Sequence, residues 1–186
     1  EILRSEITPV LNQTNDLFAR ELNQKICKRA PILSDTITHA NSAIAADAAS
    51  FVVLVSELFL KNKMCKGVEV LGSGTSGVIP EEAPLAPVGA IKALLDQTKI
   101  SLSNVAFIEL MEAYAAQAII CTRLCDLDLD KVNIRGGALS RGHPIGASGA
   151  ILVVRLFNEL INAPGASGMA AIAAAGGIGS AMMLKS

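Results

Sequence analysis

The sequence predicts an α/β protein: a mixed, mostly parallel sheet layered with helices, ending in a C-terminal antiparallel hairpin. Predicted helices and strands alternate along most of the 186 residues, which is the pattern of a parallel sheet with helices on both faces. The last two predicted strands follow one another around a glycine turn, and such a pair is antiparallel. The composition is 51% hydrophobic but only 3% aromatic, so the core must consist of aliphatic side chains, as in helices packed on a buried sheet.

Two helices are expected in the first third of the chain. Residues 17–29 carry apolar side chains at helical spacing and end before Pro31, and residues 36–38 form a short extended piece. Asn41 is a favourable N-cap for a long helix over residues 42–60, which is apolar on nearly all sides. A helix of that kind is expected between two layers rather than on a surface.

The remaining elements alternate more regularly. Strands are predicted at residues 67–79, 105–110 and 132–134, and helices at residues 84–99, 112–125 and 146–162. The longest uncharged run, residues 160–184, is broken by Pro-Gly and Gly-Gly pairs. Two strands, 168–175 and 180–185, are therefore expected there rather than a membrane span.

Charge and cysteine usage exclude several classes of function. The net charge of −1, with acids and bases interspersed, lacks the basic footprint of a nucleic-acid-binding protein. Four cysteines are too sparse for a disulfide framework, and none lies at zinc-site spacing. Cys121 and Cys125 share a helix face and are interpreted as buried free thiols. Without a signal-peptide pattern, we expect a cytoplasmic protein with no metal, no membrane span and no nucleic-acid partner.

The loop over residues 133–149 contains five of the 15 glycines and one of the two histidines, His143. His143 lies just before a predicted helix, whose positive end disfavours the imidazolium form. A neutral imidazole can act as a base or bind an oxyanion near neutral pH. A structural histidine satisfied by its neighbours is the alternative. The glycine spacing fits neither a dinucleotide fingerprint nor a phosphate-binding loop.

This loop resembles the signature of the thiolase (acetyl-CoA C-acyltransferase) family, in the pattern Asn-x-x-Gly-Gly-Ala-x-x-x-Gly-His-Pro-x-Gly-x-Ser-Gly. Residues 108–117 resemble the family's Leu-Asn-Glu-Ala-Phe-Ala block, and residues 38–49 its Thr-Ala-Gly-Asn-Ala-Ser-Gly block. The glycine-rich end, residues 168–179, is similar to the family's final hairpin. The resemblance covers nearly the whole chain, but only the C-terminal half of a thiolase. It implies one half of an αβαβα sandwich, with residues 36–186 as the C-terminal domain and residues 1–35 as a connecting region.

Thiolases condense two acetyl-CoA molecules or cleave 3-ketoacyl-CoA through an acyl-cysteine, which the resemblance places in the missing N-terminal half. It implies that His143 activates that cysteine and helps to bind the thioester oxygen, and that Gly142 and Pro144 are substrate-binding positions. The position of the family's water-holding Asn is Met111. The position of its acid/base cysteine is Ala173, so this site is degenerate.

Two further positions follow from the resemblance. The backbone N–H of Ala175 matches an oxyanion donor, and Ala43 stands where a serine contacts the pantetheine arm. No cofactor is implied, since coenzyme A is the substrate's carrier.

Two hypotheses follow. The first is an acyltransferase of lipid metabolism that needs an N-terminal half and is inactive as this chain alone. The second is a non-catalytic thiolase-like module that binds acyl-CoA, pairs with an N-terminal half or self-associates through residues 42–60.

Overall fold

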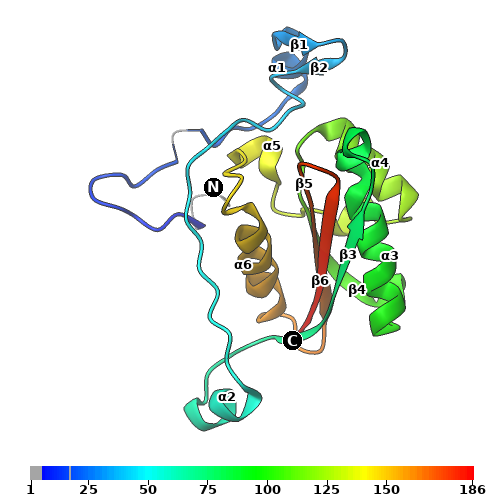
Figure 1. Cartoon of the computed structure of the whole chain (residues 1–186). Coiled ribbons are helices and arrows are strands. Elements are labelled where there is room, and N and C mark those ends of the chain that lie inside the picture. Colours follow the sequence, from blue (N-terminus) through cyan, green and yellow to red (C-terminus); the bar gives the residue numbers. More distant parts are fainter. Residues whose placement is uncertain (1–5, 17) are drawn as a thin grey trace.

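A four-stranded sheet is the centre of the computed structural model, which describes residues 6–16 and 18–186 (Figure 1). Its strands are β3 (Glu69–Gly77), β4 (Val105–Leu110), β5 (Ser167–Ala174) and β6 (Ile178–Lys185), and their order is β3-β6-β5-β4. β5 and β6 form the predicted C-terminal hairpin, and β4 runs parallel to β5. The mixed sheet and the hairpin are thus confirmed.

The balance of strand pairings differs from the prediction. Among the described strands, β3–β6 and β5–β6 are antiparallel and only β4–β5 is parallel. The returning strand of the hairpin, β6, lies between β3 and β5, so β3 pairs with it in the opposite direction. The predicted strand at residues 132–134 is reduced to one parallel bridge between Ile108 and Val132, because Asn133 adopts a left-handed conformation with φ 48°.

Helices cover both faces of the sheet (Figure 1). α3 (Ala86–Thr98) and α4 (Ala115–Leu124) lie on one face, and α6 (Ser148–Leu160) lies on the other. Alternate residues of β5 enter different clusters, since Met169 and Ala171 pack toward α3 and Ala170 toward α6. This confirms the predicted helices at 84–99 and 146–162 within a few residues, and the helix at 112–125 in shortened form.

The core is aliphatic, as the composition predicts. Along α6, Leu152, Leu156 and Leu160 recur every four residues and are at most 1% exposed. Full burial of one such side chain contributes roughly 1.5–3 kcal/mol. This row of leucines fixes α6 against the sheet, and with it the loop that precedes the helix.

Short elements complete the chain. They are α1 (Gln24–Arg29), β1 (Ile32–Ser34), β2 (Ile37–Thr38), α2 (Glu57–Lys63), α5 (Ala138–Arg141) and the 3₁₀ helices η2 (Pro80–Leu85), η3 (Leu102–Asn104) and η4 (Leu129–Lys131). α1 and the β1–β2 hairpin project from the body of the molecule (Figure 1). No helix in the described part is long and apolar enough to cross a membrane. The division of the chain at residue 35 stays a prediction.

The predicted long helix at residues 42–60 is wrong. Only α2 (Glu57–Lys63) is helical there, and an extended segment precedes it. The backbone at residues 43–45 instead meets other segments, as Ala43 N–H donates to Ala113 O and Ala45 bridges to His143. Three β-branched valines within residues 52–55 also disfavour a helix that no neighbouring layer covers. Asn41 caps no helix, because its side chain closes the turn at residues 36–41.

The predicted helix at residues 17–29 is also too long. Its helical part is α1 (Gln24–Arg29), and the Asn23 side chain caps it by accepting from Ile26 N–H at 3.0 Å. This cap ends the helix toward the N-terminus, so residues 18–22 are not helical. Residue 17, the predicted first residue of the helix, lies outside the described residues.

Candidate active site

The loop that carries His143 is attached to the end of β4 through Asn133. The side-chain amide of Asn133 donates to Leu110 O at 2.8 Å and accepts from Leu110 N–H at 2.9 Å. Asn133 is only 8% exposed, so these bonds are shielded from water. They take the place of the backbone hydrogen bonds that a full strand at residues 132–134 would make to β4. They set the point at which the loop leaves the sheet.

Glu112 holds the next part of the loop. One carboxylate oxygen accepts from Asn133 Nδ2 at 2.7 Å, and the other accepts from Leu139 N–H at 3.2 Å in the first turn of α5. A carboxylate at the start of a helix satisfies a donor that has no partner within the helix. A Cβ at position 137 would collide with this carboxylate, so a larger residue there would push Glu112 out of these bonds. Glu112 therefore fixes the start of α5, five residues before His143.

A buried ion-pair cluster holds the loop from its other side. Arg155 Nε donates to Glu109 at 3.0 Å, Arg155 Nη2 donates to Gly136 O at 2.7 Å, and Arg155 Nη1 binds both oxygens of Glu6. Arg155 is 5% exposed and Glu109 is 2% exposed. Burial raises the pKa of Glu109, and the positive charge of Arg155 acts in the opposite direction. Arg155 thus links α6, β4, the loop and the N-terminal segment.

The backbone places His143 against residues 44–45. His143 N–H donates to Ile44 O at 2.7 Å, and His143 bridges to Ala45 in parallel fashion. The preceding Gly142 has φ 88°, and a Cβ there would lie 2.8 Å from the Ala46 side chain. Glycine is needed at this position for both reasons. Pro144, which follows, is buried.

The imidazole is oriented by Ser148, the first residue of α6. His143 Nδ1 lies 2.7 Å from Ser148 Oγ, and this hydroxyl donates its one proton to Pro144 O at 3.0 Å. Ser148 Oγ must therefore accept from the histidine, so Nδ1 carries the ring proton and Nε2 carries the lone pair. This tautomer makes Nε2 a proton acceptor.

The surroundings keep the imidazole neutral. Burial lowers the pKa of His143, and the positive charge of Arg141 lowers it further. Arg141 is itself poorly compensated, because its buried Nε and Nη2 have no hydrogen-bond partner among the described residues. At neutral pH, His143 therefore offers an unprotonated Nε2, as a general base requires.

The remaining predicted site residues differ in their surroundings. Met111 is 2% exposed and packs in the core with Ala138 and α6. Its backbone N–H donates to Ala171 O, two residues before Ala173, so Met111 and Ala173 lie at neighbouring strand ends. Ala175 is exposed in the hairpin turn, and Ala43 is half-buried against the core cluster that includes Met111.

Cysteines do not complete the site. Cys121 and Cys125 lie in and just after α4, where their thiols point to Pro84 O and Val88 O, and burial is the first cause that raises the pKa of both. The prediction of buried free thiols is confirmed for Cys121. Cys125 is also a free thiol, but it is partly exposed. Cys27 and Cys65 are exposed.

Sequence reasoning missed the residues that position His143. Ser148 and Asn133 belong to the motif around His143, but the motif alone gives them no role, and Glu112 directly follows Met111 in the sequence. Arg155 and Glu109 carried a signal of their own, since a charged residue within an apolar helix or strand is seldom buried unpaired.

Comparison with known proteins identifies relatives of the chain. A family model described as "Thiolase, C-terminal domain" matches residues 65–186. The Bacillus subtilis protein named "Putative acetyl-CoA C-acetyltransferase YhfS" is 36% identical over 180 residues, which are 93% of this chain and 50% of that protein. A "Probable acetyl-CoA acyltransferase" of Staphylococcus aureus is 40% identical over 126 residues, which are 67% of this chain and 32% of that protein.

Solved structures agree. The Bacillus anthracis acetyl-CoA acetyltransferase superposes with a TM-score of 0.85 at 30% identity, covering 91% of this chain and 44% of that one. The Acat5 thiolase from Ascaris suum, in complex with coenzyme A, superposes with a TM-score of 0.83 at 31% identity, covering 99% and 50%. The chain thus spans about half the length, or less, of these relatives.

Proposed function

Because the chain belongs to the thiolase family, we propose that it binds acyl-CoA thioesters at the His143 loop and does not by itself carry out condensation or thiolysis. One observation supports this most: the loop presents a neutral histidine with a free Nε2, but positions 111 and 173 carry side chains without a transferable proton. In this proposal His143 can carry out its part of the reaction, whereas the side chains at positions 111 and 173 cannot carry out theirs.

His143 has two successive roles in this proposal. Its Nε2 accepts a proton from a thiol, which becomes the nucleophile. The imidazolium that results then donates from Nε2 to the developing oxyanion of the thioester. Ser148 keeps the ring in the required tautomer throughout, since Nδ1–H stays bonded to its hydroxyl. Gly142 and Pro144 shape the backbone around the ring, and Ala43 offers only a methyl group to a pantetheine arm.

Met111 and Ala173 limit the reaction. A methionine buried in the core offers no amide to hold a water molecule. A methyl group at position 173 exchanges no proton with the α-carbon of an acyl group, and loss of one acid–base group typically costs ~10²–10⁴-fold in rate. The backbone N–H of Ala175 keeps an oxyanion-donor role in this proposal, because that role needs no side chain.

The direct test is a titration of the 186-residue chain with acetyl-pantetheine, observed through the imidazole resonances of His143. We expect saturable shifts at His143 and none at His39, with no release of free thiol above the uncatalysed rate. A His39→Gln variant assigns the two rings. Unchanged His143 resonances at saturating ligand would show that the loop does not receive the thioester, and steady thiol release would show turnover.

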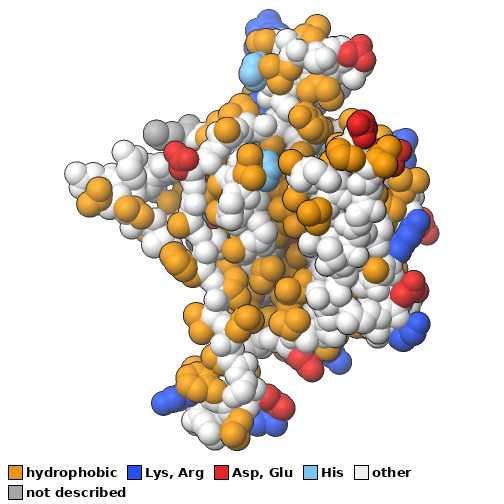
Figure 2. Space-filling view, in the orientation of Figure 1, with side chains coloured by type: hydrophobic (Ala, Val, Ile, Leu, Met, Phe, Trp, Pro, Cys, Tyr) orange, Lys and Arg blue, Asp and Glu red, His pale blue; other side chains and the backbone are white. Residues whose placement is uncertain are grey.

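An uncovered apolar segment favours a second role, in pairing. Phe51, Val53 and Leu54 are 87%, 84% and 81% exposed. Hydrophobic side chains also gather in the middle of the view in Figure 2, where α6 and the sheet lie in Figure 1. Large hydrophobic side chains that are this exposed and this close together in the chain favour an interaction surface. Because the chain spans about half of its relatives, we infer that the other half of a thiolase covers this segment.

Sedimentation equilibrium tests the pairing. We expect the chain to form a heterodimer with a thiolase N-terminal half, and to do so more weakly after Phe51→Ser plus Leu54→Ser. Val10→Ser plus Leu11→Ser, at exposed positions on the N-terminal segment, is the matched control and should leave the association unchanged. Equal loss in both variants, or no association at tens of micromolar, contradicts this role.

A further inference from the structure

The outer edge of β3 has no backbone partner. β3 is the end strand of the four-stranded sheet and pairs only with β6 (Figure 1). Among the described residues, no backbone hydrogen bond joins residues 69–77 to a segment other than β6. Alternate residues of such a strand direct their N–H and C=O groups away from the sheet, which makes the edge a template for another strand. Neither the His143 loop nor the apolar segment at residues 51–54 involves this edge.

β3 lacks the features by which natural proteins protect an edge strand. A short strand, a lysine, a proline or a bulge hinders the pairing of a second strand. β3 is nine residues long, whereas strands typically have about five or six, and residues 70–77 contain neither a charge nor a proline. Its register shift lies near the start, between Val70 and Gly72, so residues 72–77 pair regularly with β6. An edge of this kind is expected to be covered in the assembled protein.

α3 holds β3 from one face and leaves the edge free. A Cβ at Gly74 would collide with Ala90 O, and the Ser76 hydroxyl donates to Ala86 O at 2.6 Å. Positions 72, 74 and 76 therefore face α3, whereas Ser73 and Thr75 are exposed. The strand is thus already fixed in an extended form, and a partner strand would bind without the cost of ordering it.

The two ends of this edge carry opposite charge. Lys66 precedes β3, and Lys185 pairs with Glu69 at its first residue. Glu81 and Glu82 follow its last residue, and no lysine or arginine lies between them and β3. Both lysines and the two glutamates of η2 are exposed and make no ion pair among the described residues.

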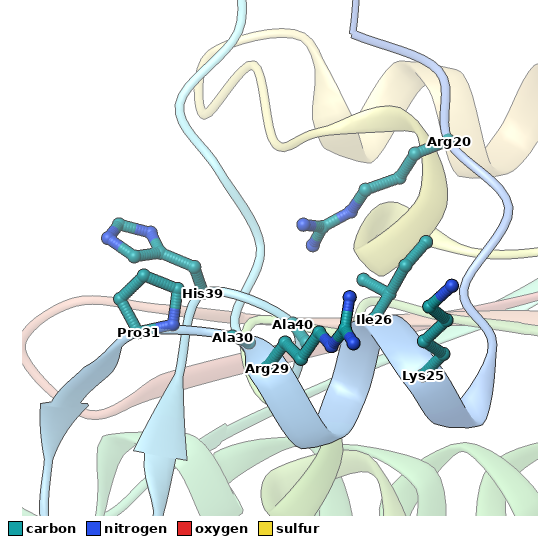
Figure 3. Close-up of a pocket in the computed structure, with 8 residues that line it drawn as sticks. All are labelled: Arg20, Lys25, Ile26, Arg29, Ala30, Pro31, His39 and Ala40. Atoms are coloured by element: carbon teal, nitrogen blue, oxygen red, sulfur yellow. The ribbon is translucent and has the colours of Figure 1, made fainter.

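The cations near α1 do not neutralise the acidic end of the edge. Arg20, Lys25 and Arg29 line an open depression beside α1 (Figure 3). Neither Glu81 nor Glu82 belongs to that lining. The acidic end of the β3 edge is therefore available to a cation from outside the chain.

We propose that β3 pairs with the β3 of a second copy of the chain, antiparallel about a two-fold axis, and joins the two four-stranded sheets into one. Such an axis brings the same surface of both copies together. With the axis between Ser73 and Gly74, Lys66 of one copy and Glu81 of the other lie at the same end of the pair. A parallel pair would instead bring like charges together, which is destabilising. This inference does not depend on acyl-CoA binding.

Sedimentation equilibrium of the 186-residue chain tests the pairing, in the original chain and with Phe51→Ser plus Leu54→Ser to remove association through the apolar segment. Ser73→Lys places a charge at the middle of the edge. Ser103→Lys, at an exposed serine of η3, is the control, and circular dichroism confirms that the variants keep their fold. We expect a dimer at tens of micromolar in both backgrounds, weakened at least about tenfold by Ser73→Lys and less than about twofold by the control. A monomer in either background, or equal weakening by both lysines, overturns the proposal.

Exchange of the end charges tests the orientation. Glu81→Lys plus Glu82→Lys makes both ends basic, and Lys63→Glu plus Lys66→Glu makes both ends acidic. Each variant should self-associate at least about tenfold more weakly than the original, and an equimolar mixture of the two should recover the association. No recovery in the mixture contradicts antiparallel pairing.

Hydrogen exchange locates the contact. Amides of β3 should gain protection as the concentration of the chain rises. Protection that appears only when a thiolase N-terminal half is added would identify a different occupant of the edge and overturn the proposal.

Discussion

His143 Nδ1 and Ser148 Oγ lie 2.7 Å apart, and the serine proton is already donated to Pro144 O. The serine thus selects one tautomer of the histidine, with Nε2 unprotonated and available as a base. This selection comes from residues only five positions apart, since the chain turns at Pro144 and Gly146 before α6 begins.

Ser148→Ala should remove that selection. The ring then exchanges between tautomers, and the ¹⁵N shifts of Nδ1 and Nε2 should move toward one another in a nitrogen-detected imidazole spectrum. Loss of the buried hydroxyl should also lower the unfolding free energy by about 0.5–1.5 kcal/mol. Ser140→Ala, on the same loop but without a side-chain hydrogen bond in the described part, is the control. Unchanged ¹⁵N shifts in Ser148→Ala would show that something else holds the tautomer.

The lowered pKa of His143 predicts a dependence of stability on pH. The unfolded chain binds a proton near pH 6.5, the ordinary value, whereas the folded chain binds it only at lower pH because of burial and Arg141. The unfolded state therefore holds more protons in that window, and folding stability falls as pH drops through 6.5 toward the folded pKa. Urea unfolding at pH 7.5 and 5.5 should show a smaller loss in His143→Gln than in the original chain. A His39→Gln variant with the same reduction would contradict the assignment to His143.

Glu112→Gln should loosen the loop. A glutamine side chain has one acceptor oxygen, whereas Glu112 accepts from both Asn133 and Leu139. Loss of one charge-assisted bond should cost roughly 1.5–3 kcal/mol in unfolding free energy. Glu81→Gln, at an exposed position in η2, should change it by less than about 0.5 kcal/mol. Chemical denaturation measures both, and equal effects would remove the anchoring role of Glu112.

Arg155→Met should be strongly destabilising, because it leaves Glu109 buried without its partner. Removal of one member of a buried ion pair typically costs about 3–5 kcal/mol. The double variant Arg155→Met plus Glu109→Leu should recover much of this loss, since no buried charge then remains between the two sites. A double-mutant cycle by urea unfolding measures the coupling. Additive losses would show that the two side chains act independently.

The sequence predicted those parts of the fold whose signal is local. The helices at 84–99 and 146–162 have apolar faces that pack on the sheet, and the glycine turn at 176–179 separates two strands as expected. The helix at 42–60 failed because an all-round apolar helix depends on layers that cover it. In the described chain its backbone meets Ala113 and His143 instead.

The site was predictable as a motif but not as a geometry. The family pattern pointed to His143, Met111 and Ala173, and a neutral histidine followed from reasoning about its position. The cause of the neutral form differs in part from the prediction. Burial and the charge of Arg141 lower the pKa of His143, whereas the prediction relied on the positive end of a helix, and α6 begins only at Ser148. The roles of Ser148 and Glu112 depend on hydrogen bonds across the loop, which spacing alone does not define.

The central claim is that His143 is ready for thiolase chemistry while positions 111 and 173 are not. Thiolysis of acetoacetyl-CoA tests it, with a thiolase N-terminal half that carries a nucleophilic cysteine supplied in trans. The account predicts negligible turnover for the original chain and a gain of at least about 10²-fold in Met111→Asn plus Ala173→Cys, abolished again by His143→Ala. Turnover of the original assembly as fast as that of the double variant would contradict it.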